Sequence, residues 1–171
     1  MPFSEMLLPE FEEEMKNTRK ILECVPDGKF NYRPHPKSMT LGEVATHVAG
    51  IPGWTTTAVG QDELDMPSDT KPEIDSSRAQ LLARFDKGVA DARTALKKCS
   101  DEKWQQTWTF KIDGQTLMQM PRAAVMRMMI MSHLIHHRAQ LGVYLRLNDV
   151  AIPGMYGPSA DEAPMGKSQT A

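Results

Sequence analysis

The chain has 171 residues, 40% of them hydrophobic and 25% charged, with a formal net charge of −2. This profile is typical of one globular domain with a sizeable core. Basic residues dominate no segment, so we expect no nucleic-acid partner. Neither a run of roughly 20 apolar residues nor a signal-peptide profile occurs, so we expect a cytoplasmic protein with no membrane partner. The distant Cys24 and Cys99 match no zinc ribbon or redox pair.

Three segments carry apolar residues at helical spacing: about residues 7–24, 40–59 and 77–99. Thr40 and Glu43 form the capping-box pattern T-x-x-E at the start of the second segment. Pro52-Gly53 should end or kink this helix, and residues 54–59 could continue it. We interpret the following residues, 60–73, as a polar loop.

The period changes between residues 104 and 120. Apolar residues alternate on both sides of Asp113-Gly114, a dipeptide typical of tight hairpin turns. Pro121 suits the first position of a last helix that runs to about residue 147. We therefore predict an all-α fold, a four-helix bundle with one short β-hairpin before the last helix. Residues 1–162 should form this single domain, and residues 163–171 a disordered tail.

The last helix has two non-polar stripes. On a helical wheel one group lies within about 40° of a single direction and is predicted to face the core: Met126, Met129, His133, His137, Gln140, Tyr144 and Leu147. Arg127, Arg138 and Arg146 point away from this direction. The second stripe comprises Met128, Met131, Ile135, Ala139 and Gly142. It predicts an interface in a homodimer, and the alternative is that the hairpin or the C-terminal segment covers it within one chain.

Three histidines are candidate metal ligands. His133 and His137 are four residues apart and share one helix face, a spacing that can hold one metal ion. His47 is the obvious third ligand, although a single histidine on an apolar face is more often a hydrogen-bonded core residue. His136 competes by its three-residue spacing from His133, but we interpret it as a neighbour of the ligands or an interface residue. His35, between two prolines, is interpreted as a loop residue.

Three neutral imidazoles leave a coordination position open, as catalytic rather than structural zinc sites do. Ligand type does not choose the metal, so we expect a divalent ion such as Zn, Ni or Fe. Glu43 and Gln140 lie near the ligands by helix phase and are the candidate catalytic residues that hydrogen-bond a ligand ring or a metal-bound water. The alternative for Glu43 is a purely capping role.

Three motifs in this order and spacing resemble the DinB/YfiT-like family of metalloenzymes. They are Arg33-Pro34-His35-Pro36-Lys37-Ser38-Met39-Thr40-Leu41-Gly42-Glu43 leading to His47, His133-x-x-x-His137-Arg138-x-Gln140, and Pro153-Gly154-x-Tyr156-Gly157-Pro158-Ser159. The resemblance implies a four-helix bundle with a metal site at His47, His133 and His137, commonly paired as a homodimer. Characterised members include thiol S-transferases that use low-molecular-weight thiols such as bacillithiol, and a mycothiol-dependent isomerase.

The leading hypothesis is a metal-dependent thiol S-transferase whose substrates are a low-molecular-weight thiol and a small electrophile. Metal coordination would deprotonate the thiol and leave a nucleophile at neutral pH. The first alternative is a metal-dependent hydrolase with Glu43 or another carboxylate as base. The second is a non-catalytic metal- or ligand-binding bundle in which the metal serves folding.

Overall fold

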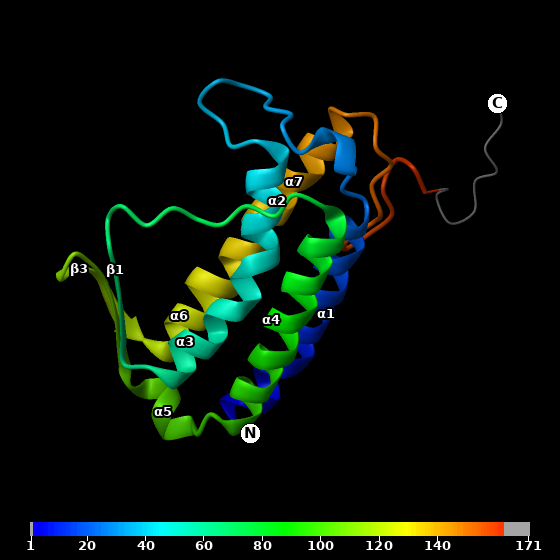
Figure 1. The fold of residues 1–171 in the computed structure, drawn as a ribbon. Coiled ribbons are helices and arrows are strands. Elements are labelled where there is room, and N and C mark those ends of the chain that lie inside the picture. The colour runs from blue at the N-terminus through cyan, green and yellow to red at the C-terminus, as the bar shows by residue number, and fades with distance from the viewer. Residues whose placement is uncertain (1, 163–171) are drawn as a thin grey trace.

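The computed structural model describes residues 2–162 and is mainly helical (Figure 1). The α-helices in chain order are α1 (Phe3–Glu23), α2 (Leu41–Gly50), α3 (Trp54–Gly60), α4 (Arg78–Lys98), α5 (Asp101–Gln105), α6 (Arg122–Val125) and α7 (His133–Arg146). The strands are β1 (Glu63–Met66), β2 (Thr107–Ile112) and β3 (Gln115–Pro121). The predicted disordered tail, residues 163–171, lies outside the described residues. Within residues 2–162 no helix has the length and hydropathy needed to span a membrane.

The long helices pack around one hydrophobic core. α1 contacts α4 and α7, and α2 contacts α4 and α7 (Figure 1). Phe11, Leu22, Phe85, Leu96 and Leu134 are among the side chains buried in this core. The predicted mainly helical fold is confirmed, but the helices are not four continuous rods. A 3-10 turn at Ile51–Gly53 separates α2 from α3, and a π-helical segment at Met126–Ser132 joins α6 to α7.

Both hydrogen bonds of the capping box at the start of α2 are present. The Glu43 backbone N–H donates to the Thr40 hydroxyl at 3.1 Å. The Thr40 backbone N–H donates to the Glu43 carboxylate at 2.6 Å. Two N–H groups that the helix itself cannot satisfy are therefore paired. This fixes where α2 begins, and hence which of its residues face α7.

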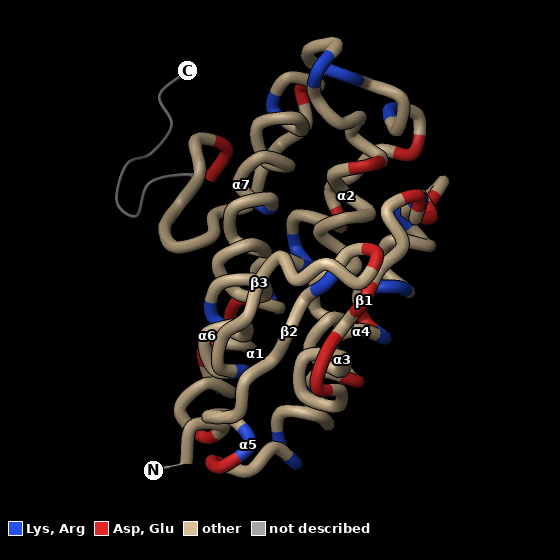
Figure 2. The backbone as a smooth tube through the Cα atoms, turned by 90° about the vertical axis from the view of Figure 1, so that its left-hand side faces the viewer, with Lys and Arg blue, Asp and Glu red and all other residues tan. Residues whose placement is uncertain are grey.

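The prediction of a single hairpin is wrong, because a third strand joins it. β2 and β3 pair antiparallel around Asp113-Gly114, and β1 pairs parallel with β2 in a three-stranded sheet of the described chain. β1 lies inside residues 60–73, which the sequence predicts to be a loop. Its sequence, Glu63-Leu64-Asp65-Met66, alternates acidic and apolar residues over four positions only, and its acidic residues colour the β1 tube red in Figure 2. Tertiary contacts supply the preference instead, since Lys111 donates to Glu63 at 2.6 Å and the Gly114 N–H to Asp65 at 3.0 Å.

The core-facing direction predicted for the last helix is also wrong. Met126 is fully buried, whereas His133 and His137 are only half-buried. Arg138, predicted to point outward, is 2% exposed. The reason is the π-helical segment, whose i→i+5 hydrogen bonds turn the chain less per residue than an α-helix does. A wheel drawn through this segment therefore assigns Met126 and His133 to one face that they do not share.

The predicted homodimer face is smaller than the sequence indicated. Met131 is 1% exposed and Gly142 is buried within the chain. The C-terminal segment covers part of this side, because Arg138 donates to the Tyr156 hydroxyl at 2.5 Å. Met128 and Ala139 remain exposed and Ile135 half-buried. The homodimer itself stays a prediction that rests on these residues.

Arg122 is expected to be the strongest polar link between the helices and the sheet. It is 1% exposed and donates to the carbonyls of Ala58 at 3.0 Å, Gln61 at 2.8 Å and Thr107 at 3.3 Å. Arg122→Met would leave these acceptors unpaired, so we expect a loss of about 3 kcal/mol in the free energy of unfolding, measured by urea denaturation. The matched Arg127→Met breaks an exposed pair and should cost less than about 1 kcal/mol. Equal losses would contradict this assignment.

Candidate metal centre

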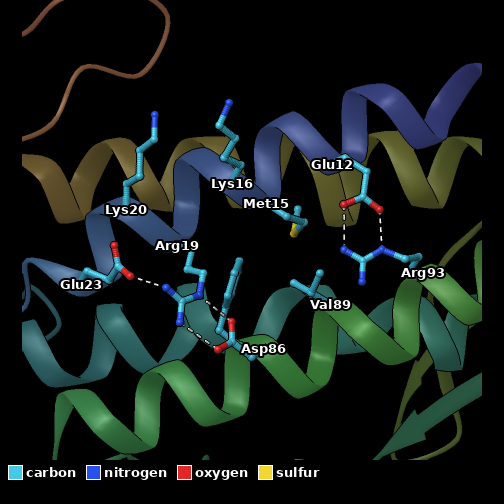
Figure 3. Close-up of a pocket in the computed structure, with 10 residues that line it drawn as sticks. Glu12, Met15, Lys16, Arg19, Lys20, Glu23, Asp86, Val89 and Arg93 are labelled. Carbon is cyan, nitrogen blue, oxygen red and sulfur yellow. Dashed lines mark hydrogen bonds and ion pairs between the residues drawn. The ribbon is translucent and has the colours of Figure 1, made fainter.

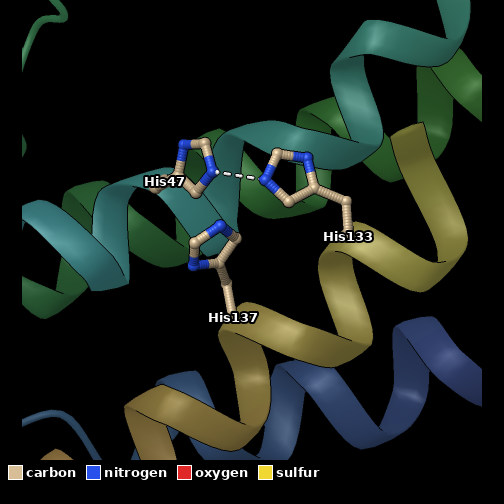
Figure 4. Close-up of side chains that lie close together, drawn as sticks. All are labelled: His47, His133 and His137. Carbon is tan, nitrogen blue, oxygen red and sulfur yellow. Dashed lines mark hydrogen bonds between the residues drawn. The ribbon is translucent and has the colours of Figure 1, made fainter. Parts of the chain in front are cut away.

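Three imidazoles meet where α2 lies against α7 (Figure 4). His47 comes from the last turn of α2, and His133 and His137 are the first and fifth residues of α7. One ring nitrogen of each lies within 4.8 Å of the other two. The His47 and His133 Nε2 atoms are 3.2 Å apart although their residues are 86 positions apart in the chain. The structure thus brings together the three residues that the sequence proposes as ligands.

Hydrogen bonds on the far side of two rings set their tautomers. The His133 Nδ1 lies 3.2 Å from the Met129 carbonyl oxygen, and the His137 Nδ1 lies 2.7 Å from the Gln140 Oε1. Each oxygen can only accept, so each Nδ1 carries the proton and donates. The Nε2 atoms of His133 and His137 therefore keep their lone pairs. Metal-binding histidines are commonly oriented in this way.

The local electrostatics keep these rings neutral. Burial, followed by the neighbouring imidazoles, lowers the pKa of His47 to about 4. Burial also lowers the pKa of His133 and of His137, although their hydrogen bonds to Met129 and Gln140 oppose the shift. A neutral imidazole is the form that binds a metal. At neutral pH the three side chains are therefore in the ligating state.

The donor set fits a divalent cation. With metal–nitrogen distances of about 2.0–2.1 Å, two nitrogens on a tetrahedral ion are about 3.3 Å apart. The observed 3.2 Å between the Nε2 atoms of His47 and His133 matches that separation. Without an ion, His47 must turn an Nε2–H toward His133 to avoid two opposed lone pairs. Among residues 2–162, His47, His133 and His137 are the side chains that lie close enough together to bind one metal ion. No carboxylate belongs to this group.

Gln140 and Glu43, the two other candidate site residues, are placed differently. Gln140 lies between two rings, since its Oε1 accepts from His137 and its Nε2 donates to the His136 Nε2 at 3.1 Å. Glu43 belongs to the capping box, and Arg33 lies 3.4 Å from its carboxylate. The Thr40 backbone hydrogen bond lowers the pKa of Glu43. The contact predicted between a site residue and a ligand ring is thus seen for Gln140, while Glu43 caps α2.

The other two histidines lie outside the cluster. His136 is exposed, and its ring centroid is 4.8 Å from that of His137. His35 is exposed in the loop before α2, where its Nδ1 accepts from the Lys37 backbone N–H at 3.2 Å. Both placements agree with the sequence interpretation of these residues.

Sequence reasoning missed Trp54, which borders the site. Its ring centroid is 5.4 Å from that of His47 and 5.4 Å from that of His133. The residue follows His47 by seven positions, which is two helical turns and therefore the same face. That spacing is the signal that could have found it, but Pro52-Gly53 between the two residues concealed it.

A hollow lies between α1 and α4, away from the histidines (Figure 3). It measures about 540 Å³ and has an apolar floor of Met15, Phe85 and Val89. Its guanidinium groups are already paired, Arg93 with Glu12 at 2.5 Å and Arg19 with Asp86 at 2.9 Å. These ion pairs bridge the two helices. The hollow is therefore a helix–helix groove whose charged groups already have partners.

Comparisons with known proteins agree on one family. The sequence profile of the DinB superfamily matches residues 10–141. The uncharacterized protein YrdA of Bacillus subtilis (strain 168) is 29% identical over 157 residues, 91% of this chain and 89% of that protein. The crystal structure of a DinB-like protein from Bacillus cereus ATCC 10987 has a TM-score of 0.71 at 21% identity and covers 91% of this chain and 98% of that one. A second, the DinB-like protein YjoA from Bacillus subtilis, has a TM-score of 0.66 at 16% identity and covers 88% and 97%. At these identities the two structures show a shared fold.

We expect one divalent ion per chain, bound by His47, His133 and His137. His133→Ala or His137→Ala should lower zinc affinity by more than about 100-fold. Removing a residue that only hydrogen-bonds to a ligand typically costs about 10–100-fold, and removing the ligand itself should cost more. His35→Ala is the matched control and should bind normally. Metal content after dialysis, measured by mass spectrometry, checks both. Full occupancy in His137→Ala, with loss only in His136→Ala, would overturn the ligand set.

The metal-free protein should lose stability on mild acidification. Native His47 stays neutral down to about pH 4, whereas an unfolded histidine takes up a proton below about pH 6.5. The unfolded state therefore binds more protons in this window, and the free energy of unfolding falls as pH drops from about 6.5 to about 4. Urea denaturation at several pH values should show a shallower decline for His47→Gln. The same decline in both proteins would contradict a depressed pKa at His47.

Proposed function

Since this chain belongs to the DinB superfamily and gathers three neutral imidazoles at one point, we propose that it is a metal-dependent thiol S-transferase. Its substrates would be a low-molecular-weight thiol and a small electrophile. The observation that carries the proposal is the pair of fixed tautomers at His133 and His137, which present Nε2 lone pairs beside His47. An all-imidazole set without a carboxylate ligand suits a site that activates a bound partner.

His47, His133 and His137 would hold the ion, with zinc, nickel and iron the metals that imidazole ligands suit. When bound there, a divalent ion lowers the pKa of a coordinated thiol so that the thiolate predominates at neutral pH. Gln140 and the Met129 carbonyl keep two of the rings oriented toward the ion. Burial keeps the rings from taking up protons in competition with it.

The proposed reaction needs no nucleophile from the protein. The thiol gives its proton to solvent, its sulfur forms a bond to the electrophilic carbon, and the leaving group departs with the bonding electron pair. Cys24 and Cys99, the free cysteines of the chain, would make poor substitutes, because burial raises the pKa of each thiol. The attacking sulfur would thus come from the cosubstrate.

A metal-dependent hydrolase is the second candidate and has less support. It needs a general base within reach of the attacking water. Glu43 is the carboxylate nearest to the ligands in sequence, but it is committed to the Thr40 cap and its pKa is lowered. A carboxylate held in this way is a weak base. The third candidate, a binding module without turnover, shares the metal site and differs only in having no reaction.

Turnover assays separate these candidates. Zinc- or nickel-loaded protein should join thiols to 1-chloro-2,4-dinitrobenzene, with bacillithiol, mycothiol, cysteine and glutathione as the panel and dinitrophenyl thioether absorbance as the readout. The activity should vanish in His137→Ala and persist in His35→Ala. Gln140→Leu should weaken metal binding about 10–100-fold and regain activity in excess metal. Ester hydrolysis without thiol would favour the hydrolase, and inertness of the loaded protein would favour the binding module.

A further inference from the structure

The start of α3 reverses the usual order of apolar and polar residues. Trp54 is 38% exposed, whereas the next residue, Thr55, is completely buried. The Thr55 hydroxyl is directed at the Met126 sulfur, 3.9 Å away. An exposed large apolar side chain is informative when a neighbouring polar one takes the buried place. Local rules broken in this way are expected at functional positions.

Trp54 lies beside the histidine cluster and is 38% exposed to solvent. Its ring meets His47 edge-on, at an interplanar angle of 66°, and is tilted by 47° to His133. The imidazoles are half-buried, and the indole beside them is exposed. A molecule that reaches the imidazoles from solvent on this side therefore passes the indole. The ring supplies an apolar wall at a site whose other known groups are polar.

The backbone before Trp54 is held against α4. Gly53 packs directly on Gly88 of α4, where an added Cβ at Gly88 would come within 3.1 Å of the Gly53 nitrogen. The Thr56 hydroxyl donates to the Gly53 carbonyl at 2.7 Å. The 3-10 turn that breaks α2 from α3 is thus clamped against α4. The backbone that carries the indole is thus already ordered, and ligand binding does not have to order it.

We propose that Trp54 is a specificity-determining residue that takes the planar, electron-poor part of the electrophile beside the metal ligands. The inference rests on the proposed S-transfer and names its substrate class: aromatic or conjugated electrophiles. The face of an indole carries negative charge density and stacks well on electron-poor rings. Stacking of a planar ring on an aromatic side chain typically changes affinity by roughly 5- to 100-fold. A saturated ring of equal size gains the contact area without the stacking.

Binding of two unreactive probes to the zinc-loaded protein tests this. The probes are 1,3-dinitrobenzene, which has no leaving group, and nitrocyclohexane as its saturated counterpart, both measured by equilibrium dialysis. Trp54→Ala should lower the affinity for 1,3-dinitrobenzene about tenfold, and Trp54→Phe should retain most of it. Nitrocyclohexane loses only the contact area, so its affinity should fall by a factor at least about twofold smaller. Leu117→Ala, an exposed apolar residue of β3, is the control and should change neither.

Two results would overturn the inference. The first is unchanged affinity of Trp54→Ala for 1,3-dinitrobenzene, and the second is loss of zinc from Trp54→Phe, which would make the indole a packing group of the metal site. The transfer assay, run in parallel on the unmodified protein, keeps the two proposals distinct. Trp54-dependent probe binding without any thiol turnover would refute S-transfer and support the aromatic wall. Turnover with probe binding independent of Trp54 would refute the wall alone.

Discussion

The rotation of α7 about its own axis is the constraint on which the site depends. Arg138 follows His137 directly and is buried against α1, where it donates to the Glu14 carbonyl and the Thr18 hydroxyl, both at 3.1 Å, and pairs with the Glu14 carboxylate at 2.7 Å. Turning the helix would pull this guanidinium out of its partners and leave a buried charge unpaired. The ion pair on the α1 side therefore fixes the direction of both α7 histidines on the α2 side.

The π-helical segment before α7 adjusts that rotation to the rest of the chain. Its wider turns let Met126, Ile130 and Met131 fill the core while the helix beyond them presents His133 toward α2. Single π-helical turns are frequent at functional sites. Here the segment ends at Ser132, directly before His133, whose ring bonds to the carbonyl of Met129 within the segment. The π-helical segment therefore allows its apolar residues to pack in the core while His133 faces α2.

Structural features that depend on neighbouring residues could be predicted from the sequence. Features that depend on residues far apart in the chain could not. The capping box at Thr40 and the turn at Asp113-Gly114, where φ is +47° and +77°, are determined by a few neighbouring residues. The grouping of His133 and His137 follows from spacing alone. In contrast, β1 depends on pairing with β2, and the buried position of Arg138 depends on Glu14, 124 residues away. The periodicity of apolar residues gives no information about pairing with β2 or about contact with Glu14. It also assumes a regular α-helix, which the π-helical segment interrupts.

The position of the histidines relative to the core bears on what a metal would do. The core is formed by apolar side chains such as Leu134, Leu141 and Leu145 on a different face of α7, so folding does not need an ion to supply missing contacts. Zinc sites that drive folding occur where the apolar core is too small to do so. A half-buried cluster beside a complete core, with the tautomers of His133 and His137 already fixed by protein oxygens, is instead preorganised for an ion that exchanges ligands with solvent. That arrangement favours a metal that acts on a substrate over one that only stabilises the fold.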